Sequence, residues 1–296
     1  MSSHESFVQL NDGHKVPRIA YGSGTAWFEK SGPDGINSEL RDATLTALRC
    51  GYTHLDTAKV YGNERSTGAA IEACGMKRDQ LYITTKIMSQ MTKIKETLKV
   101  QLSDLKIDYV DLYLIHSSTF VSEAGAPTLQ EAWKVMEEIQ SEGLAKSIGV
   151  SNYRINDLKE TLKNAKVKPA VNQIEFHPYV WTEAEPLLKF MKEEGIALAA
   201  YGPQVPVVKK AGGKADPILE RISKERNLTT GQVLLKWAKA HNAIVVTTSG
   251  KEERMKLNLE AVMKSQEDLS NEEIEEINKA GKENGVQRAF MQHMSQ

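Results

Sequence analysis

The sequence predicts a closed (β/α)8 TIM barrel, an α/β fold in which eight parallel strands and their helices alternate along the chain. Short β-branched or apolar runs recur at intervals of roughly 25–35 residues, and a longer amphipathic run follows most of them. Strands that alternate with helices form an all-parallel sheet, which is either doubly wound or closed. Eight evenly spaced strands in a chain of 296 residues favour closure into a barrel.

The apolar runs define eight expected strands, and the amphipathic runs between them define the helices. The strands are expected at Arg18–Tyr21, Thr53–Asp56, Leu81–Thr85, Tyr109–Ile115, Lys146–Val150, Ala170–Ile174, Ile196–Ala200 and Ala243–Thr247. The helices are expected at Ser38–Arg49, Asn63–Ala73, Lys93–Leu105, Leu129–Ser141, Asn156–Lys163, Glu183–Glu194, Asp216–Arg226 and Thr229–His241. One more helix, Asn271–Ala280, opens with Ser270 and Glu273 at the spacing of a capping box.

The two ends of the chain add elements outside the barrel. Phe7–Leu10 and Lys15–Val16 flank Asn11-Asp12-Gly13, a turn signal that predicts an N-terminal β-hairpin. Such a hairpin would close the bottom of the barrel, away from the catalytic loops. The tail from Gly281 to Gln296 has no strong periodicity, so we expect it to lie over the barrel mouth.

Composition restricts the class of protein. Hydrophobic residues make up 40% of the chain, enough for a sizeable core, and no run approaches the roughly 20 apolar residues of a membrane helix. A net charge of -1 gives no reason to expect nucleic acid or an anionic membrane as partner. No Pro/Gly/Ser-rich linker divides the sequence, which predicts a single domain over residues 1–296.

Several features point to the cytoplasm. The N-terminus MSSHESFVQL lacks a basic region followed by an apolar stretch, so we expect no secretory signal. Cys50 and Cys74 lie in helical patterns, and two buried thiols in a reducing compartment are the ordinary interpretation.

Four ionisable residues follow three neighbouring strands of the predicted barrel. Asp56 ends the second strand, Lys86 the third and His116 the fourth, while Tyr61 lies five residues past Asp56. Catalytic groups of parallel barrels lie at the carboxyl ends of the strands, so the four side chains should share one pocket. Each alone has a structural explanation, such as helix capping for Asp56 or core packing for His116. As a set they point to catalysis.

This set suits the reduction of a carbonyl group. A phenol has an ordinary pKa near 10, so Tyr61 gives up its proton reluctantly. The ammonium of Lys86 would lower that pKa by favouring the phenolate, and Asp56 would keep the ammonium charged and oriented. His116, by donating to the same oxygen, would fix and polarise the substrate. The four residues supply a proton donor and an oxygen-binding pocket, but no hydride.

Six motifs together resemble the aldo-keto reductase superfamily. They are LDTAKVYGNE (55–64), TTK (84–86), LIHS (114–117), GVSNY (149–153), VNQIEFHP (171–178) and SGKEERMKLN (249–258). The resemblance runs from about Val16 to Gln287 and implies a (β/α)8 barrel that uses a nicotinamide cofactor without a Rossmann domain. Consistently, no GxGxxG follows a strand; the nearest run, 22–27, ends a strand without opening a helix.

The resemblance assigns a role to each matching residue. Tyr61 would be the general acid, tuned by Lys86 and Asp56, while His116 would orient the carbonyl. The expected cofactor-binding residues are Thr25, Ser151, Asn152, Gln173, Tyr201, Thr248, Ser249, Lys251, Arg254 and Asn258, and no metal is expected. Of these, Ser151, Asn152 and Gln173 would bind the nicotinamide carboxamide, and Tyr201 would stack on its ring. Helix capping by Ser151 and Asn152 and core packing of Tyr201 are compatible with those roles.

The adenosine end of the cofactor departs from the family pattern. Many members carry Pro-Lys-Ser at the eighth strand, with the lysine on the 2′-phosphate of NADPH, whereas this chain has Thr247-Thr248-Ser249. Lys251 and Arg254 can still supply two positive charges to that phosphate, and Arg254 near a helix start is rationalised by a bound anion. We therefore expect NADPH as the cofactor.

The Thr-Thr-Ser-x-Lys variant, GSGTAW (22–27) and the ending NKAGKENGVQRAF (278–290) resemble a fungal subgroup of this superfamily. That subgroup reduces conjugated polyketones, ketopantoyl lactone and α-keto amides, so the expected substrate is a small α-dicarbonyl. Ser117 stands where several members carry a bulky Trp, which predicts a roomier pocket. Trp27 and the tail around Phe290 are the expected apolar walls.

Other functions remain open at this stage. A general aldose or aldehyde reductase of the same superfamily is the nearest alternative. A non-catalytic barrel that binds nicotinamide is also compatible with the fold. A metal-dependent barrel hydrolase would use residues such as His54, Asp56 and His177, but the pair at the second strand is His-x-Asp rather than His-x-His, and Tyr61 would have no role. We expect a small-molecule carbonyl as the partner and a monomeric chain.

Overall fold

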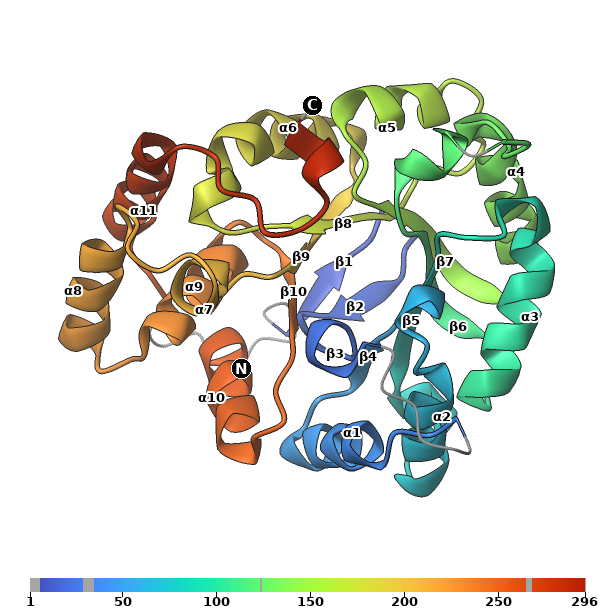
Figure 1. Ribbon diagram of the computed structural model, residues 1–296, viewed down its shortest axis with the longest axis horizontal. Helices are drawn as coiled ribbons and strands as arrows, with labels where there is room; N and C mark the ends of the chain where they lie inside the picture. The colour runs from blue at the N-terminus through green and yellow to red at the C-terminus, as the bar shows by residue number, and fades with distance from the viewer. Residues whose placement is uncertain (1–5, 29–34, 123, 265–267, 296) are drawn as a thin grey trace.

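The computed structural model describes residues 6–28, 35–122, 124–264 and 268–295. In this part of the chain eight parallel strands close into a barrel in the order β10-β3-β4-β5-β6-β7-β8-β9 (Figure 1). The strands are β3 Ile19–Gly22, β4 His54–Asp56, β5 Tyr82–Ile87, β6 Val110–Ile115, β7 Ala145–Ser151, β8 Val171–Glu175, β9 Ala197–Tyr201 and β10 Ile244–Thr247. The predicted barrel and all eight strands are thereby confirmed, with bounds shifted by one or two residues.

Helices surround the barrel on its outside (Figure 1). They are α1 Ser38–Cys50, α2 Glu64–Ala73, α3 Ile94–Leu105, α4 Leu129–Ser141, α5 Ile155–Leu162, α6 Trp181–Glu194, α7 Val205–Val208, α8 Asp216–Arg226, α9 Thr230–Ala240, α10 Glu252–Met263 and α11 Asn271–Asn284. The predicted capping box is present at α11, where the Ser270 side chain accepts from the Glu273 amide. The sequence pattern did not delimit α7 and α10, and α11 runs four residues beyond the predicted end. Among the described helices, none is long and apolar enough to cross a membrane.

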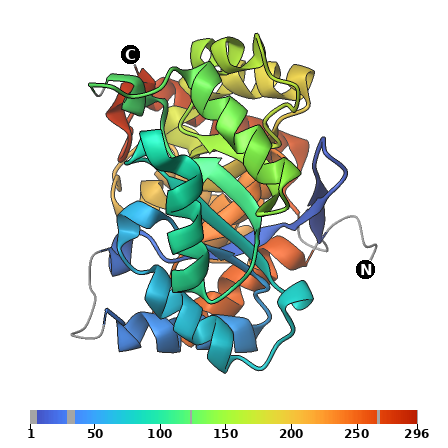
Figure 2. The ribbon, with the colours of Figure 1, turned by 90° about the vertical axis from the view of Figure 1, so that its right-hand side faces the viewer.

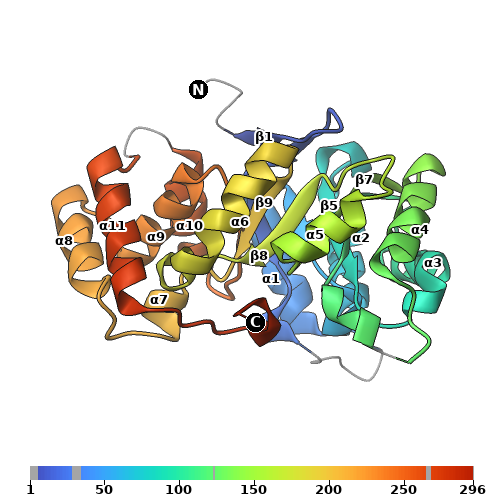
Figure 3. The same cartoon turned by 90° about the horizontal axis from the view of Figure 1, so that it is seen from above.

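The N-terminal hairpin and the C-terminal tail lie at opposite ends of the barrel (Figures 2 and 3). Strands β1 Phe7–Gln9 and β2 Lys15–Pro17 pair antiparallel, as predicted. Val8 and Val16 of this hairpin pack into a small apolar cluster with Leu112 and Leu114, which closes the bottom of the barrel. The mouth, where the strands end, is left to the loops and the tail.

Most of the core lies between the barrel and its helices. Trp133 of α4 and Trp237 of α9 are fully buried there, and burial of such large rings contributes strongly to stability. Gly68 allows α2 to approach the end of α3 closely, since a Cβ atom there would lie 2.2 Å from the Asp104 carbonyl oxygen. Cys50 and Cys74 are partly exposed rather than fully buried, which corrects the sequence interpretation.

Candidate active site

Asp56, Lys86 and His116 meet at the mouth because β4, β5 and β6 are adjacent in the barrel. Asp56 is the last residue of β4, Lys86 is the last but one of β5, and His116 follows β6 directly. Tyr61 ends a short 3-10 turn, Lys59–Tyr61, that begins three residues after β4. The structure therefore brings together the four side chains that the sequence selected.

Lys86 is held as a buried ammonium group. Its side chain is 0% exposed, and its Nζ donates to Asp56 Oδ1 at 2.5 Å and to the Thr57 carbonyl oxygen at 2.8 Å. Burial alone would lower the pKa of Lys86, but attraction to the Asp56 carboxylate and to Tyr61 outweighs it and raises that pKa. Gln173 Nε2 donates to the other carboxylate oxygen of Asp56 at 2.8 Å. The positive charge next to Tyr61 is thus permanent and fixed in place.

The Tyr61 ring is packed between aromatic and cationic neighbours. The His116 ring contacts it edge-on at a centroid distance of 5.6 Å, and Lys86 Nζ lies 5.3 Å from the ring centre. Burial raises the pKa of Tyr61 above its ordinary value, although Lys86 pulls it in the opposite direction. We expected the ammonium to favour the phenolate; here burial outweighs that effect, so Tyr61 stays protonated at neutral pH. A protonated phenol is the form that a general acid requires.

His116 is a neutral imidazole in this environment. Burial, followed by repulsion from the Lys86 ammonium, holds the pKa of His116 well below its usual range. Its Nδ1 atom is buried and has no hydrogen-bond partner among the residues that the structure describes. The backbone oxygen of His116 accepts from Asn152 Nδ2 at 2.9 Å, which ties β6 to β7 at the mouth.

The residues expected at the nicotinamide form one hydrogen-bonded group. Asn152 has the left-handed conformation at φ 56° and accepts at Oδ1 from the Tyr201 hydroxyl at 2.8 Å. Ser151 Oγ donates to the Gln173 carbonyl oxygen and accepts from Asn152 Nδ2. The Nδ2 group of Asn152 is therefore already engaged within the chain. These hydrogen bonds fix the Tyr201 hydroxyl and the Gln173 backbone, and the Gln173 side chain in turn contacts Asp56.

A cavity of about 240 Å³ joins the catalytic group to the loop after β10. Its lining includes Asp56 and Tyr61 at one end and Thr248 and Arg254 at the other. The residues between them are Gly22, Gly24, Thr25, Gln173, Tyr201, Gly202, Pro203, Gln204, Val205, Val208, Lys209, Val246, Thr247 and Phe290. Such an elongated cavity suits an extended ligand whose reactive end lies near Tyr61.

Unpaired polar atoms lie at this cavity and next to it, on the lining residue Thr248 and on Asn258 of α10, which contacts the lining residue Gln204. Thr248 Oγ1 and Asn258 Nδ2 are buried and have no partner in the described part of the chain. Asn258 Oδ1 accepts from Gln204 Nε2, and Ser249 Oγ accepts from the Lys251 amide, while Lys251 itself is exposed. Buried polar groups are normally paired, so these atoms fit a hydrogen-bonding ligand such as adenosine phosphate.

The aromatic residue beside Tyr61 at the mouth is Phe28 and not the expected Trp27. The Trp27 ring lies at the loop after β10, since it would contact a Cβ atom at Gly250 at 3.6 Å. Phe28, the next residue, is the one beside Tyr61, at a ring distance of 6.0 Å, and it is 39% exposed. Sequence reasoning did not single out Phe28. An aromatic residue directly after Trp27 was the available signal.

The roomier pocket that we expect beside Ser117 is limited by His293 of the C-terminal tail. Ser117 is fully buried, and its hydroxyl contacts Thr119 and His293 Nε2. His293 Nε2 also lies 3.1 Å from the Asn152 backbone oxygen. His293 was not predicted, because nothing in the sequence indicated that this part of the tail returns to β7.

Comparison with known proteins identifies the family. The family model described as the aldo/keto reductase family matches residues 20–282. The chain belongs to this family. It is 40% identical to an NAD/NADP-dependent indole-3-acetaldehyde reductase of Schizosaccharomyces pombe, over 96% of this chain and 98% of that protein. It is 35% identical to an NADPH-dependent alpha-keto amide reductase of Saccharomyces cerevisiae, over 98% and 95% respectively.

Solved structures agree with this assignment. An aldo-keto reductase of Bombyx mori in complex with NADP has a TM-score of 0.80 and 31% identity, and the match covers 93% of this chain and 92% of that one. The aldo/keto reductase of Brucella melitensis has a TM-score of 0.79 and 32% identity, over 93% and 98%. The chain is therefore an oxidoreductase of the aldo/keto reductase family, and its general chemistry is carbonyl reduction.

Proposed function

We propose that this chain reduces α-dicarbonyl compounds to alcohols with NADPH as the hydride source. The observation that carries the proposal is the position of Tyr61, a protonated phenol beside the buried Lys86–Asp56 pair, at one end of an elongated cavity. This arrangement supplies a proton where the oxygen of a carbonyl substrate would lie.

The proton transfer follows from the charges at the site. His116 and the Tyr61 hydroxyl bind the carbonyl oxygen; a nicotinamide held by Gln173 and Tyr201 would supply the hydride that the carbonyl carbon accepts. Tyr61 gives its proton to the oxygen, and the ammonium of Lys86 stabilises the phenolate that forms. Asp56 keeps Lys86 charged throughout, because the pKa of Lys86 is raised by this pairing. The neutral state of His116 adds no second positive charge that would compete with Lys86.

The residues of the cavity fit the cofactor along its length. Gln173 and Tyr201 would hold the nicotinamide end, while Thr248 and Arg254 of the cavity and the neighbouring buried Asn258 would hold the adenosine end. NADPH is proposed because Arg254 lines the cavity, the Saccharomyces relative is NADPH-dependent and the Bombyx structure is a complex with NADP. The Schizosaccharomyces relative is described as using NAD or NADP. Comparable kcat/KM with NADH would remove the proposed role of Lys251 and Arg254.

Two observations bear on the substrate. An α-dicarbonyl is activated towards hydride by its second carbonyl group, and the alpha-keto amide reductase relative acts on such a compound. Phe28 supports a second candidate, an aromatic aldehyde, because its exposed ring lies next to Tyr61 and can stack on a planar substrate. The relative that reduces indole-3-acetaldehyde fits this candidate.

We propose a monomeric, cytoplasmic enzyme formed by one domain over residues 1–296, with small carbonyl compounds rather than nucleic acid as partners. In the described residues no group of three or more His, Cys, Asp and Glu side chains is arranged to hold a metal. His54, the first residue of the alternative metal motif, instead contacts Thr84 Oγ1 through Nε2 at 2.8 Å.

The test follows the absorbance of NADPH with a panel of substrates: isatin, ketopantoyl lactone, an α-keto amide, indole-3-acetaldehyde and xylose. We expect kcat/KM for at least one dicarbonyl to exceed that for xylose by about a hundredfold or more. Indole-3-acetaldehyde as the best substrate would favour the second candidate. Equal kcat/KM for isatin, ketopantoyl lactone and xylose would contradict the dicarbonyl proposal.

A further inference from the structure

Glu175, the last residue of β8, is a buried carboxylate outside the catalytic group. It is 1% exposed, and both of its oxygens accept hydrogen bonds from the tail. Oε1 accepts from the Ala289 amide at 2.7 Å and Oε2 from the Phe290 amide at 3.1 Å. His177 Nε2 lies 2.9 Å from Oε1, and burial lowers the pKa of His177, so it faces Glu175 as a neutral donor. A charged acceptor on two successive amides is a strong anchor.

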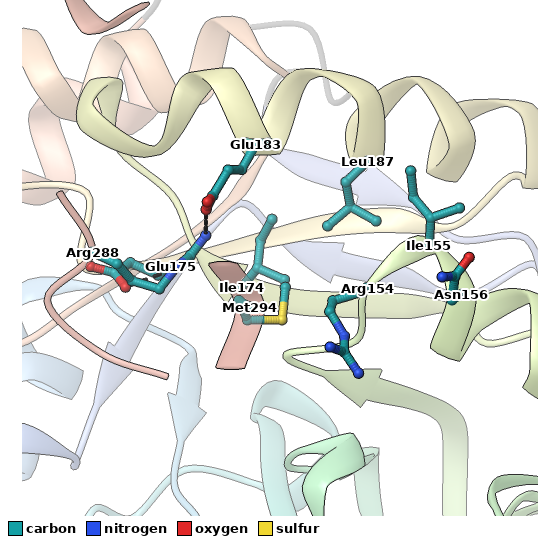
Figure 4. Close-up of a pocket in the computed structure, with 10 residues that line it drawn as sticks. Arg154, Ile155, Asn156, Ile174, Glu175, Glu183, Leu187, Arg288 and Met294 are labelled. Carbon is teal, nitrogen blue, oxygen red and sulfur yellow. Dashed lines mark hydrogen bonds and ion pairs between the residues drawn. The ribbon is translucent and has the colours of Figure 1, made fainter. Parts of the chain in front are cut away.

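Arg288 extends this anchor to a neighbouring helix. Its Nη1 lies 3.6 Å from Glu175 Oε2, and its Nη2 donates to Glu183 Oε2 of α6 at 2.6 Å. Figure 4 shows Arg288 on the tail reaching the Glu183 carboxylate on α6. Arg288 is only 8% exposed, so both carboxylates are opposed by a buried positive charge.

The tail beyond this anchor also makes apolar contacts, since Met294 is only 8% exposed and belongs to the hydrophobic core. A cavity of about 410 Å³ separates it from α5 and α6, and Met294 of the tail lines it together with Ile174 and Leu187 (Figure 4). The Glu175 carboxylate thus holds the Ala289 and Phe290 amides, whereas apolar packing of Met294 holds the far end of the tail.

Phe290 of the tail contacts the end of the site where we expect the nicotinamide. The Phe290 ring meets the Tyr201 ring edge-on at 5.8 Å and lines the cavity that leads to Tyr61. Lys209 Nζ lies 4.5 Å from the centre of the Phe290 ring. Glu175 and Tyr201 are directly paired across β8 and β9, so the anchor and the ring that it positions lie on neighbouring strands.

We propose that Glu175 is a positioning residue for carbonyl binding: its carboxylate fixes the amides of Ala289 and Phe290 and so places the Phe290 ring as a wall of the pocket. The inference rests on the proposed carbonyl reductase function. Glu175 does not line the cavity that leads to Tyr61, whereas Phe290 does, so Glu175 acts through Phe290. Substitutions at Glu175 should therefore change KM for the carbonyl substrate far more than kcat.

The test compares Glu175→Gln with the matched control Glu183→Gln in the full chain. The neutral amide introduced by Glu175→Gln would offer one acceptor oxygen in place of two, and loss of a charged hydrogen bond should raise KM for the carbonyl about tenfold or more with kcat nearly unchanged. Glu183→Gln weakens the contacts of Arg288 and Ser295 with α6 but not the bonds to the Ala289 and Phe290 amides, so it should leave KM within about twofold of wild type. Equal effects of the two substitutions on KM would overturn the proposal.

A double-mutant cycle shows whether the effect passes through Phe290. We expect Phe290→Ala to raise KM as Glu175→Gln does, and the double variant to be no worse than either single variant. Because Phe290 is only half-buried, this variant keeps the fold even where Glu175→Gln does not. A shared mechanism would be contradicted if the fold-increases in KM of the two single variants multiplied in the double variant, or if Phe290→Ala left KM unchanged.

Hydrogen exchange separates this proposal from the proposed function. The Ala289 and Phe290 amides should be protected in the wild type and should exchange at least about tenfold faster in Glu175→Gln, but not in Glu183→Gln. If the wild type reduced no carbonyl, the proposed function and the role in carbonyl binding would both be refuted. The exchange rates would still show whether Glu175 holds the two tail amides. Unprotected amides in an active wild type would refute the anchor alone.

Discussion

Gly24 is predicted to determine the position of the Tyr61 hydroxyl. A Cβ atom at Gly24 would lie 3.0 Å from Tyr61 Cζ, 3.2 Å from Cε2 and 3.3 Å from the hydroxyl oxygen. Carbon atoms in contact are normally about 3.5–4.0 Å apart, so Gly24→Ala must displace the ring by a few tenths of an ångström. The backbone itself accepts alanine, since φ is -77° and ψ is -168° at Gly24. The perturbation therefore leaves the backbone unstrained and acts on the phenol and on the cavity that Gly24 lines.

The expected cost is catalytic rather than structural. A misplacement of about 1 Å can cost about a hundredfold in rate, so we expect kcat/KM of Gly24→Ala to fall by roughly 10–100-fold. Its melting temperature should stay close to that of wild type. Gly250→Ala is the control, because its Cβ atom would meet Trp27 only at an ordinary 3.6 Å.

The assay measures kcat/KM from NADPH consumption and, separately, NADPH affinity from cofactor fluorescence. Gly24 also lines the cavity, so the affinity shows whether the new methyl group obstructs the cofactor instead of moving Tyr61. We expect the affinity to change less than kcat. A Gly24→Ala variant with wild-type kcat/KM would refute the idea that the ring is held against Gly24.

Three further predictions concern charge. Lys86→Met should abolish most activity and destabilise the fold by about 3–5 kcal/mol, because it leaves the Asp56 carboxylate buried without its cationic partner. The double variant Lys86→Met/Asp56→Asn should regain stability in thermal melts but not turnover in rate assays. The pKa of His54 is lowered by burial to about 4, so the unfolded chain binds the proton first as the pH falls. His54 should therefore lower the free energy of unfolding by about 2 kcal/mol between about pH 7 and pH 5. In urea titrations, the free energy of unfolding of His54→Asn should fall by about 2 kcal/mol less over the same pH range. Arg254→Ala should raise KM for NADPH about tenfold and leave KM for NADH nearly unchanged; equal changes would refute a phosphate contact.

The sequence was sufficient for the barrel and for the convergence of the catalytic residues. Apolar runs located all eight strands, and the rule that parallel strands end at one rim placed Asp56, Lys86 and His116 together. These inferences succeed because they depend on local patterns and on one regular geometry. Strand bounds moved by only one or two residues, which changes no position at the mouth.

The contacts that shape the pocket could not be inferred in the same way. Phe28 rather than Trp27 lies beside Tyr61, because the chain turns after β3 and no periodicity defines which side chain faces inward. The bonds from Glu175 to the tail join residues that are distant in the sequence and depend on where an irregular segment returns. The direction of the Tyr61 pKa depends on burial, which the residue types alone do not reveal.

Tyr61→Phe tests the central claim most directly, because it removes one hydroxyl group and leaves the ring between His116 and Phe28 in place. Rates of NADPH consumption should be compared for both proteins with the best carbonyl substrate of the panel, and NADPH binding should be measured in parallel. We predict that kcat falls by about 10²–10⁴-fold while NADPH affinity and thermal stability stay close to wild type. Normal turnover by Tyr61→Phe would contradict the assignment of this residue as the proton donor.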